Sequence, residues 1–187
     1  MKQYIFESPR LGFRQWRNSD RKPFAEMNAC KEVMRFFPDV LSMDQSNERL
    51  NRILEYFETN DFGLWAVEIK ETKEFIGFIG FNTAVCIPEV SPVTEIGWRL
   101  DNKYWNCGYA TEGAKKCLDH GFNTLGFEQI YAYATHCNHS SINVIKKIGM
   151  YKTGEFNHPV YREDSSLKLQ FIFKLEKREY KNISKEA

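Results

Sequence analysis

The stretch "DNKYWNCGYATEGAKKCLDHGF", residues 101–122, joins a polar, aromatic loop to a helix through small side chains. Beyond the junction, small and apolar residues recur at helical spacing, at Ala110, Ala114, Cys117, Leu118, Gly121, Phe122 and Leu125. With Gly108 and Ala110 at the junction itself, the backbone N–H groups at the start of the helix are left uncovered. Such a helix start is suited to binding an anion.

Predicted strands lie on both sides of this helix. Along residues 94–100 two sets of side chains alternate between the faces of a half-buried strand: Ile96, Trp98 and Leu100 on one, and Glu95, Gly97 and Arg99 on the other. Further strands are expected at 11–16, 64–69, 75–82, 129–135 and 167–175, and further helices at 18–30, 42–60 and 140–150. This order of strands and helices predicts an α/β fold.

Length and charge set limits on the class of protein. The 187 residues suit one domain, 1–187, with a charged and frayed tail over residues 175–187. The 26 Lys and Arg against 25 Asp and Glu give a net charge of +1 without a dense basic block, so we expect no direct nucleic-acid binding. The chain lacks an apolar run long enough for a membrane span, and its start lacks the run of a signal peptide. We therefore expect a cytoplasmic protein without membrane contact.

The cysteines indicate reduced thiols. They are five in number, widely spread and without a C-x-x-C pair. His136, Cys137 and His139 stand close together in the sequence, but no second ligand cluster at zinc-finger spacing accompanies them. We expect these three to be polar surface residues, and we expect no metal.

Two segments together resemble the GCN5-related N-acetyltransferase (GNAT) superfamily. "WNCGYATEG", residues 105–113, is similar to the acyl-CoA loop of that family, Arg/Gln-x-x-Gly-x-Gly/Ala, at Gly108 and Ala110. "NHSSINVIKKIGM", residues 138–150, resembles the Asn-x-x-Ser…Lys-x-Gly-Phe stretch of the Rim-type branch, whose named members acetylate the N-termini of ribosomal proteins.

The resemblance extends over most of the chain. "SPRLGFRQW" at 8–16 and "KEVMRFFP" at 31–38 also look like the Rim-type branch, so the likeness covers about residues 8–175. It implies the GNAT acyl-CoA acyltransferase fold. In this α/β fold a mixed sheet of six to seven strands carries helices on both faces, and its central parallel strands are splayed.

The resemblance also implies acetyl-CoA as the co-substrate. Its pyrophosphate would bind backbone amides at the loop and helix start, at Cys107, Gly108, Tyr109, Ala110 and Thr111. Its pantetheine arm would lie between the strands at 94–100 and 129–135, along the main chain of Trp98, Arg99 and Leu100. Asn138 would hold a pantetheine amide, and Asn143, one turn on, would touch the cofactor or face solvent.

The loop departs from the family pattern at two positions. Trp105 replaces the usual Arg or Gln, and Asn106 stands where glycine is common. Either the affinity for the phosphates is lower, or a neighbouring cation such as Lys103 compensates.

Acetyl transfer in this family proceeds by direct attack of the amine, which needs a base and a proton donor. We expect Glu95 to act as the base, through water; the alternative is a solvated surface carboxylate. His158 is a second candidate base. The family's acidic tyrosine is replaced by Ile145, so Ser141 would donate its hydroxyl to the sulfur; alternatively Ser140 or Ser141 caps the helix.

The acceptor pocket is expected over the first two helices. Trp16, Phe36 and Phe37 would form its aromatic walls, unless these rings belong to the core, and the loop at 156–164 with His158 would close over the substrate. The acceptor would be the primary amine of a protein N-terminus or of a small molecule, and the protein a monomer or a homodimer. Two alternatives stay open, transfer of another acyl group such as succinyl and a non-catalytic acyl-CoA-binding module.

Overall fold

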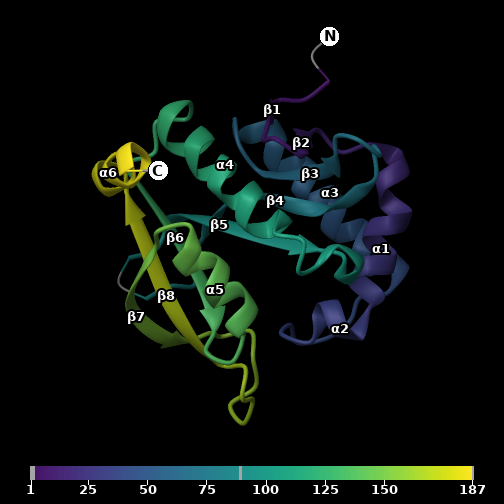
Figure 1. Ribbon diagram of the computed structural model, residues 1–187. Helices are drawn as coiled ribbons and strands as arrows, with labels where there is room; N and C mark the ends of the chain where they lie inside the picture. Colours follow the sequence, from purple (N-terminus) through teal and green to yellow (C-terminus); the bar gives the residue numbers. More distant parts are fainter. Residues whose placement is uncertain (1–2, 89, 187) are drawn as a thin grey trace.

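The structure is a computed structural model that describes residues 3–88 and 90–186 (Figure 1). The regular elements follow in this order: β1 (Phe6–Glu7), β2 (Leu11–Arg14), the 3₁₀ turn η1 (Asn18–Asp20), α1 (Arg21–Ala29), α2 (Lys31–Met34), α3 (Met43–Thr59), β3 (Leu64–Ile69), β4 (Phe75–Ala84), β5 (Val93–Leu100), the 3₁₀ turn η2 (Asn102–Tyr104), α4 (Tyr109–Asn123), β6 (Gln129–Thr135), α5 (His139–Lys147), β7 (Tyr151–Asn157), β8 (Leu169–Glu176) and α6 (Lys177–Glu186).

Eight strands within the described ranges form one sheet, in the order β1-β2-β3-β4-β5-β6-β8-β7. Neighbouring strands are antiparallel except for β5 and β6, which run parallel. Among the described residues these two strands share a single ladder pair, Glu95 with Tyr131, although β5 continues to Leu100 and β6 to Thr135. They therefore part toward their carboxyl ends, which confirms the expected splay.

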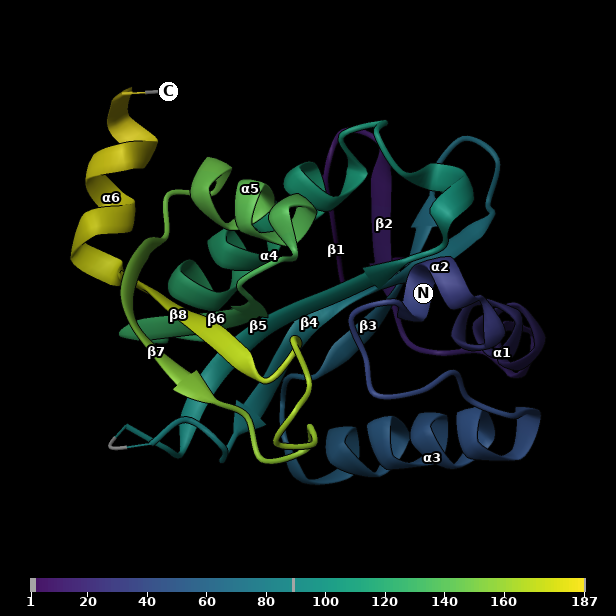
Figure 2. The same cartoon turned by 90° about the horizontal axis from the view of Figure 1, so that it is seen from below.

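Helices cover both faces of this sheet. Figure 2 shows α4 and α5 on one side and α1 and α3 on the other. The core under α4 and α5 includes Ile79 and Phe122, while a second core on the α1 and α3 side includes Phe24, Leu50 and Phe78. Successive side chains of β5 therefore enter two different environments.

Two helices begin where the central strands part. β5 leads through η2 into α4, and β6 leads directly into α5. α4 lies close to the sheet because Gly113 has no side chain: a Cβ at this position would lie 2.3 Å from Cδ1 of Ile79. The carboxyl ends of two parallel strands and the N-terminal ends of two helices thus meet at one place.

The expected α/β architecture is confirmed, but the sheet is larger than six or seven strands. The two strands not expected are β1, which has two residues, and β7 at the sheet edge. Most side chains of β7 are exposed, so it lacks the alternation of apolar residues that marks a half-buried strand.

The expected frayed tail is also corrected. β8 continues to Glu176, and residues 177–186 form α6. The ring of Tyr180 stacks on Phe122 of α4 with the ring centroids 5.0 Å apart, and its hydroxyl donates to Asp119. This contact docks α6 against the body of the protein.

Candidate active site

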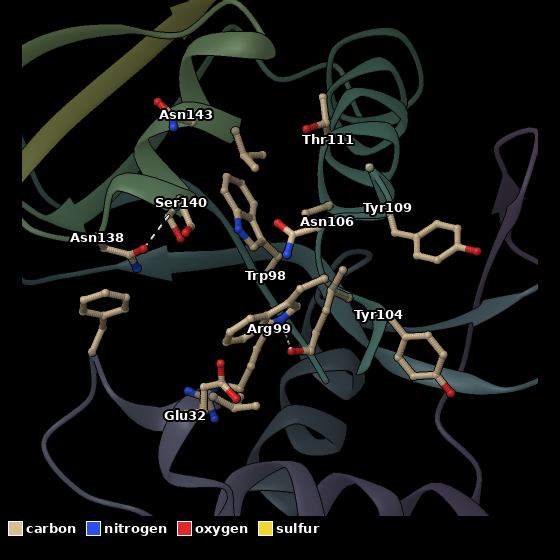
Figure 3. Close-up of a pocket in the computed structure, with 18 of the residues that line it drawn as sticks. Glu32, Trp98, Arg99, Tyr104, Asn106, Tyr109, Thr111, Asn138, Ser140 and Asn143 are labelled. Carbon is tan, nitrogen blue, oxygen red and sulfur yellow. Dashed lines mark hydrogen bonds between the residues drawn. The ribbon is translucent and has the colours of Figure 1, made fainter. Parts of the chain in front are cut away.

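A cavity of about 450 Å³ lies where β5 and β6 part, beside α2 and the N-terminal ends of α4 and α5 (Figure 3). Twelve of the sixteen expected site residues line it: Phe36, Phe37, Trp98, Arg99, Leu100, Gly108, Tyr109, Ala110, Thr111, Asn138, Ser141 and Asn143. In Figure 3 Trp98 lies between the first turn of α5, marked by Ser140, and the loop at Asn106. The other four expected residues, Trp16, Glu95, Cys107 and His158, lie outside this lining.

The start of α4 is open, as its small residues predict. Gly108 is the N-cap residue, with φ of 82°, and no described side chain caps the helix there. The N–H groups of Tyr109, Ala110 and Thr111 therefore have no partner within the helix. Together with the helix dipole they can bind an anion, each charge gaining about 0.3–1 kcal/mol from the dipole at an exposed site.

The structure accounts for the two departures in the loop. Asn106 has φ of 61°, a left-handed conformation that asparagine tolerates better than most residues. Trp105 holds the loop to the sheet, since its Nε1 donates to the Leu100 carbonyl over 2.9 Å. Lys103 does not line the cavity; its side chain is 75% exposed and its Nζ lies 3.7 Å from Asp101.

Arg10 is a cation near the loop that sequence reasoning missed. Its Nη1 donates to the Cys107 carbonyl over 3.0 Å, and its guanidinium lies over the Tyr109 ring. Its Nε lies 2.6 Å from Glu112, a carboxylate in the first turn of α4. Burial raises the pKa of Glu112, but hydrogen bonds from Ser8 and Arg10 outweigh burial and lower it. Arg10 thus neutralises a charge that would repel a phosphate.

No local sequence signal marks Arg10. It is separated from Glu112 by 102 residues, and only the fold brings the two together. Cys107, whose carbonyl accepts from Arg10, has an exposed thiol that contacts the Trp105 carbonyl.

The start of α5 differs from that of α4 because it is capped. Oδ1 of Asn138 accepts from the Ser141 backbone N–H over 3.1 Å, so the cap is Asn138 and not one of the two serines. The Ser141 hydroxyl lines the cavity and has no hydrogen-bond partner among residues 3–88 and 90–186. Asn143 is exposed at the rim, and Ile145 is buried in the core.

Glu95 lies on the face of β5 opposite Trp98 and Leu100. Because it forms the ladder pair with Tyr131, it marks the point where the two central strands begin to part. It is partly buried, neither enclosed in the core nor fully exposed at the surface. Burial raises the pKa of Glu95 to about 8, against the opposing charge of Arg49. A carboxyl group with a pKa near neutral can accept and release a proton.

His158 lies in the loop after β7. Its ring is 5.6 Å from the rings of both Tyr133 and Tyr161, and its Nδ1 accepts from the Val160 backbone N–H. Burial lowers the pKa of His158, so its imidazole is neutral at pH 7. The Tyr161 hydroxyl donates to the Phe36 carbonyl over 2.8 Å, which packs this loop against the segment after α2.

Trp16 is a core residue rather than a pocket wall. It is 9% exposed, and its ring packs against Phe24, Phe75 and Phe78. Its Nε1 donates to the Leu64 carbonyl over 2.7 Å, which satisfies its polar atom. For this aromatic the alternative of a core position holds, because a large ring beside a sheet gains more from burial than from exposure.

The part of the chain that the structure describes holds no group of three His, Cys, Asp or Glu side chains placed to bind a metal ion. Nor does any helix within it have the length and apolar character that crossing a bilayer requires.

Comparisons with known proteins agree with the resemblance seen in the sequence. The model of the family described as acetyltransferase (GNAT) domain matches residues 10–151. The chain is 27% identical over 160 residues to a Bacillus subtilis (strain 168) protein described as an uncharacterized N-acetyltransferase, YoaA, and the match covers 84% of this chain and 89% of that protein.

Solved structures show the same fold. A spermidine N-acetyltransferase from Vibrio cholerae, in complex with CoA and spermine, matches with a TM-score of 0.73 and 17% identity over 92% of this chain and 99% of its own. RimL, a ribosomal L7/L12 alpha-N-protein acetyltransferase in complex with coenzyme A, matches with a TM-score of 0.76 and 14% identity over 93% of this chain and 98% of its own.

Proposed function

This chain belongs to the GNAT family of acetyltransferases, and we propose that it transfers an acetyl group from acetyl-CoA to a primary amine by direct attack on the thioester. One observation carries the proposal: the uncapped start of α4 opens into the cavity at which β5 and β6 part. CoA-bound proteins of this fold are among the structural relatives, which supports CoA as the carrier.

The residues of the cavity fit acetyl-CoA, which supplies an acetyl group activated as a thioester. The amides of residues 109–111 would bind its pyrophosphate, with Arg10 holding the loop and balancing Glu112. Lys147 adds positive charge to the lining, while Arg35 lies 3.7 Å from Glu32, which also lines the cavity. The edge of β5 that β6 leaves unpaired would hydrogen-bond the pantetheine arm as an added strand does, and Asn138 would donate from its side-chain amide.

Two side chains would manage the protons of the reaction. Glu95 would accept the proton of the attacking amine, directly or through water, because its pKa of about 8 suits a base at mildly alkaline pH. The Ser141 hydroxyl, which has no partner among the described residues, would donate to the departing sulfur. His158 is a second candidate base, since a neutral imidazole can accept a proton.

We further propose that the protein belongs to the Rim-type branch and that Phe36 and Phe37 contact the acceptor. The motif at 138–150 supports the branch, and both phenylalanines line the cavity. The acceptor would then be a peptide N-terminus or a small molecule with a primary amine.

The proposal is tested by release of free CoA thiol, with acetyl-CoA and a panel of peptide and small-molecule amines. We expect amine-dependent turnover with acetyl-CoA, and slower turnover with succinyl-CoA. Saturable binding of acetyl-CoA without turnover on any amine would overturn the catalytic proposal and leave an acyl-CoA-binding module. Comparable rates with the two thioesters would overturn the choice of acetyl donor.

A further inference from the structure

The face of β5 opposite Trp98 has open space above Gly97. Glu95, Gly97 and Arg99 share this face, which is covered by α1 and α3. A Cβ placed on Gly97 would meet just one atom of the described residues within 4 Å, Oε1 of Glu95 at 3.9 Å. The space above Gly97, between the candidate base and Arg99, is therefore open.

Arg99 is a buried cation without an anion. Arg99 is only 5% exposed, and its Cζ lies 4.0 Å from the ring centroid of Phe37. Nη1 donates to Oδ1 of Asn28 over 2.6 Å, and Asn28 in turn donates to Ser46. Nε is buried and has no hydrogen-bond partner within residues 3–88 and 90–186. The hydrogen bond to Asn28 fixes the guanidinium, while its Nε edge, which could bind a carboxylate in a bidentate way, has no partner at Nε among the described residues.

Arg49 brings a second positive charge to the same region. It projects from α3, and its Nε is also buried without a partner in the described part of the chain. Its charge acts on both Glu95 and Arg99, which places it near each of them. Burial and then the charge of Arg49 lower the pKa of Arg99 to about 9.

Another buried arginine of this protein, Arg14, forms ion pairs with carboxylates. Arg14 is 4% exposed, and its guanidinium binds the carboxylates of both Asp20 and Glu68. A buried charge without such a partner is costly. Neither Arg49 nor Arg99 forms an ion pair with a described carboxylate, and the two cations outnumber the one carboxyl group whose charge acts on Arg49, that of Glu95. The region is therefore positively charged and lacks a counter-ion among the described residues.

We infer that the acceptor is a primary amine that also carries a carboxylate, and that Arg49 and Arg99 bind this carboxylate on the α3 side of β5. The inference rests on the proposed acetyl transfer and specifies its substrate class. Either a free amino acid or a peptide with an acidic residue next to its N-terminal amine has this chemistry. A polyamine carries positive charge alone, so this face of β5 would repel it.

Matched pairs of acceptors test the inference in the thiol-release assay. Comparing L-alanine with L-alaninamide measures the effect of an α-carboxylate. Comparing Ala-Asp-Ala amide with Ala-Asn-Ala amide measures the effect of a side-chain carboxylate. Spermidine serves as the cationic acceptor. We expect the acid of at least one pair to exceed its amide by about 10–100-fold in kcat/KM, because the amide leaves a buried charge unpaired. The pair that shows the preference identifies the source of the carboxylate.

Variants of the two arginines connect the preference to this site. R49Q should raise KM for the preferred acid, bring the acid and amide rates close together, and leave CoA affinity unchanged. R178Q is the matched control, since Arg178 is an exposed arginine of α6, outside this face of β5. R99K keeps the charge but loses the planar fork of the guanidinium, so it should also bring the acid and amide rates closer together.

The outcomes separate the two proposals. Turnover without any preference for the acid in either pair, or a preference that survives in R49Q, would overturn the carboxylate inference and leave acetyl transfer in place. Spermidine as the fastest acceptor would do the same. Cofactor binding without turnover on any amine would overturn both.

Discussion

In the proposed function, the two faces of β5 bind different ligands by different means. Toward α4, binding depends on the backbone: an uncapped helix start, a loop that requires Gly108 and Asn106 in left-handed conformations, and a strand edge that β6 leaves open. Toward α3, it depends on charged side chains from distant segments, Arg49, Glu95 and Arg99. A backbone site leaves a compact motif in the sequence, whereas a side-chain site is assembled by the fold.

The largest expected effect is on the α3 side, at Glu95. E95Q keeps the shape of the side chain but removes its ability to accept a proton. We expect kcat/KM to fall about 10²–10⁴-fold, while the Kd for CoA measured by calorimetry stays unchanged. A variant as fast as the wild-type protein would show that Glu95 is not the base.

The proposed role of Glu95 also predicts how activity depends on pH. With a pKa near 8, Glu95 is protonated and inactive as a base at lower pH and becomes ionised as the pH rises. The ratio of wild-type to E95Q activity should therefore rise through half its maximum at about pH 8 and level off about one pH unit higher. Using the ratio cancels the titration of the acceptor amine, which both proteins share. A ratio that is constant across this range would contradict the assignment.

On the α4 side the largest effect is expected at Gly108. G108V forces a branched side chain into a backbone with φ of 82° and shields the amides of the helix start. Loss of hydrogen bonds to a charged phosphate should weaken CoA binding about 10–100-fold. G126V is the control, because Gly126 has φ of 76°, free space around it and a position outside the cavity.

Both glycine variants should lose similar stability in denaturant unfolding, since each places valine in a left-handed conformation. Only G108V should lose affinity for CoA. Equal CoA affinities for the two would mean that the start of α4 is not the phosphate site.

A smaller effect is expected at Ser141. Removing its hydroxyl in S141A takes one hydrogen bond from the departing sulfur, and kcat should fall by about tenfold or less with KM for acetyl-CoA unchanged. S140A changes the adjacent serine, which is exposed at the rim, and should keep the wild-type kcat in steady-state assays. A reversed order of the two variants would assign the donor to Ser140.

The smallest effect is expected at Arg10, which acts through the loop. R10Q should weaken CoA binding by about 2–5-fold, as expected for a half-exposed ion pair, and the loss should shrink at high salt. K103Q is the matched comparison, because Lys103 is the cation that the sequence alone favours. If K103Q loses more affinity than R10Q, the role assigned to Arg10 is wrong.

The sequence predicts the lining of the cavity well and the charged residues on the opposite face of β5 poorly, for physical reasons. The motifs at 105–113 and 138–150 place residues of the cavity correctly because the features they encode, small residues at a helix start and an asparagine cap, are local. Arg10 and Arg49 were not predicted, since their partners are distant in the chain and an exposed and a buried arginine read alike in a sequence.

The aromatic residues and the sheet edge show the same limit. The sequence predicts Trp16 to line the acceptor pocket, yet in the fold its ring packs in the core against Phe24 and Phe78. The sequence does not predict β7, because this edge strand is held by its pairing with β8 and has no alternating apolar pattern. Burial and pairing decide both cases, and neither is visible in local spacing.

The most direct test of the central claim is an NMR titration of the ¹⁵N-labelled protein with CoA. The account predicts saturable shifts of the backbone amides of Tyr109, Ala110 and Thr111, together with those of β5 beyond Glu95, and little change along α3. Saturable binding that leaves the three amides at the start of α4 unmoved would contradict it.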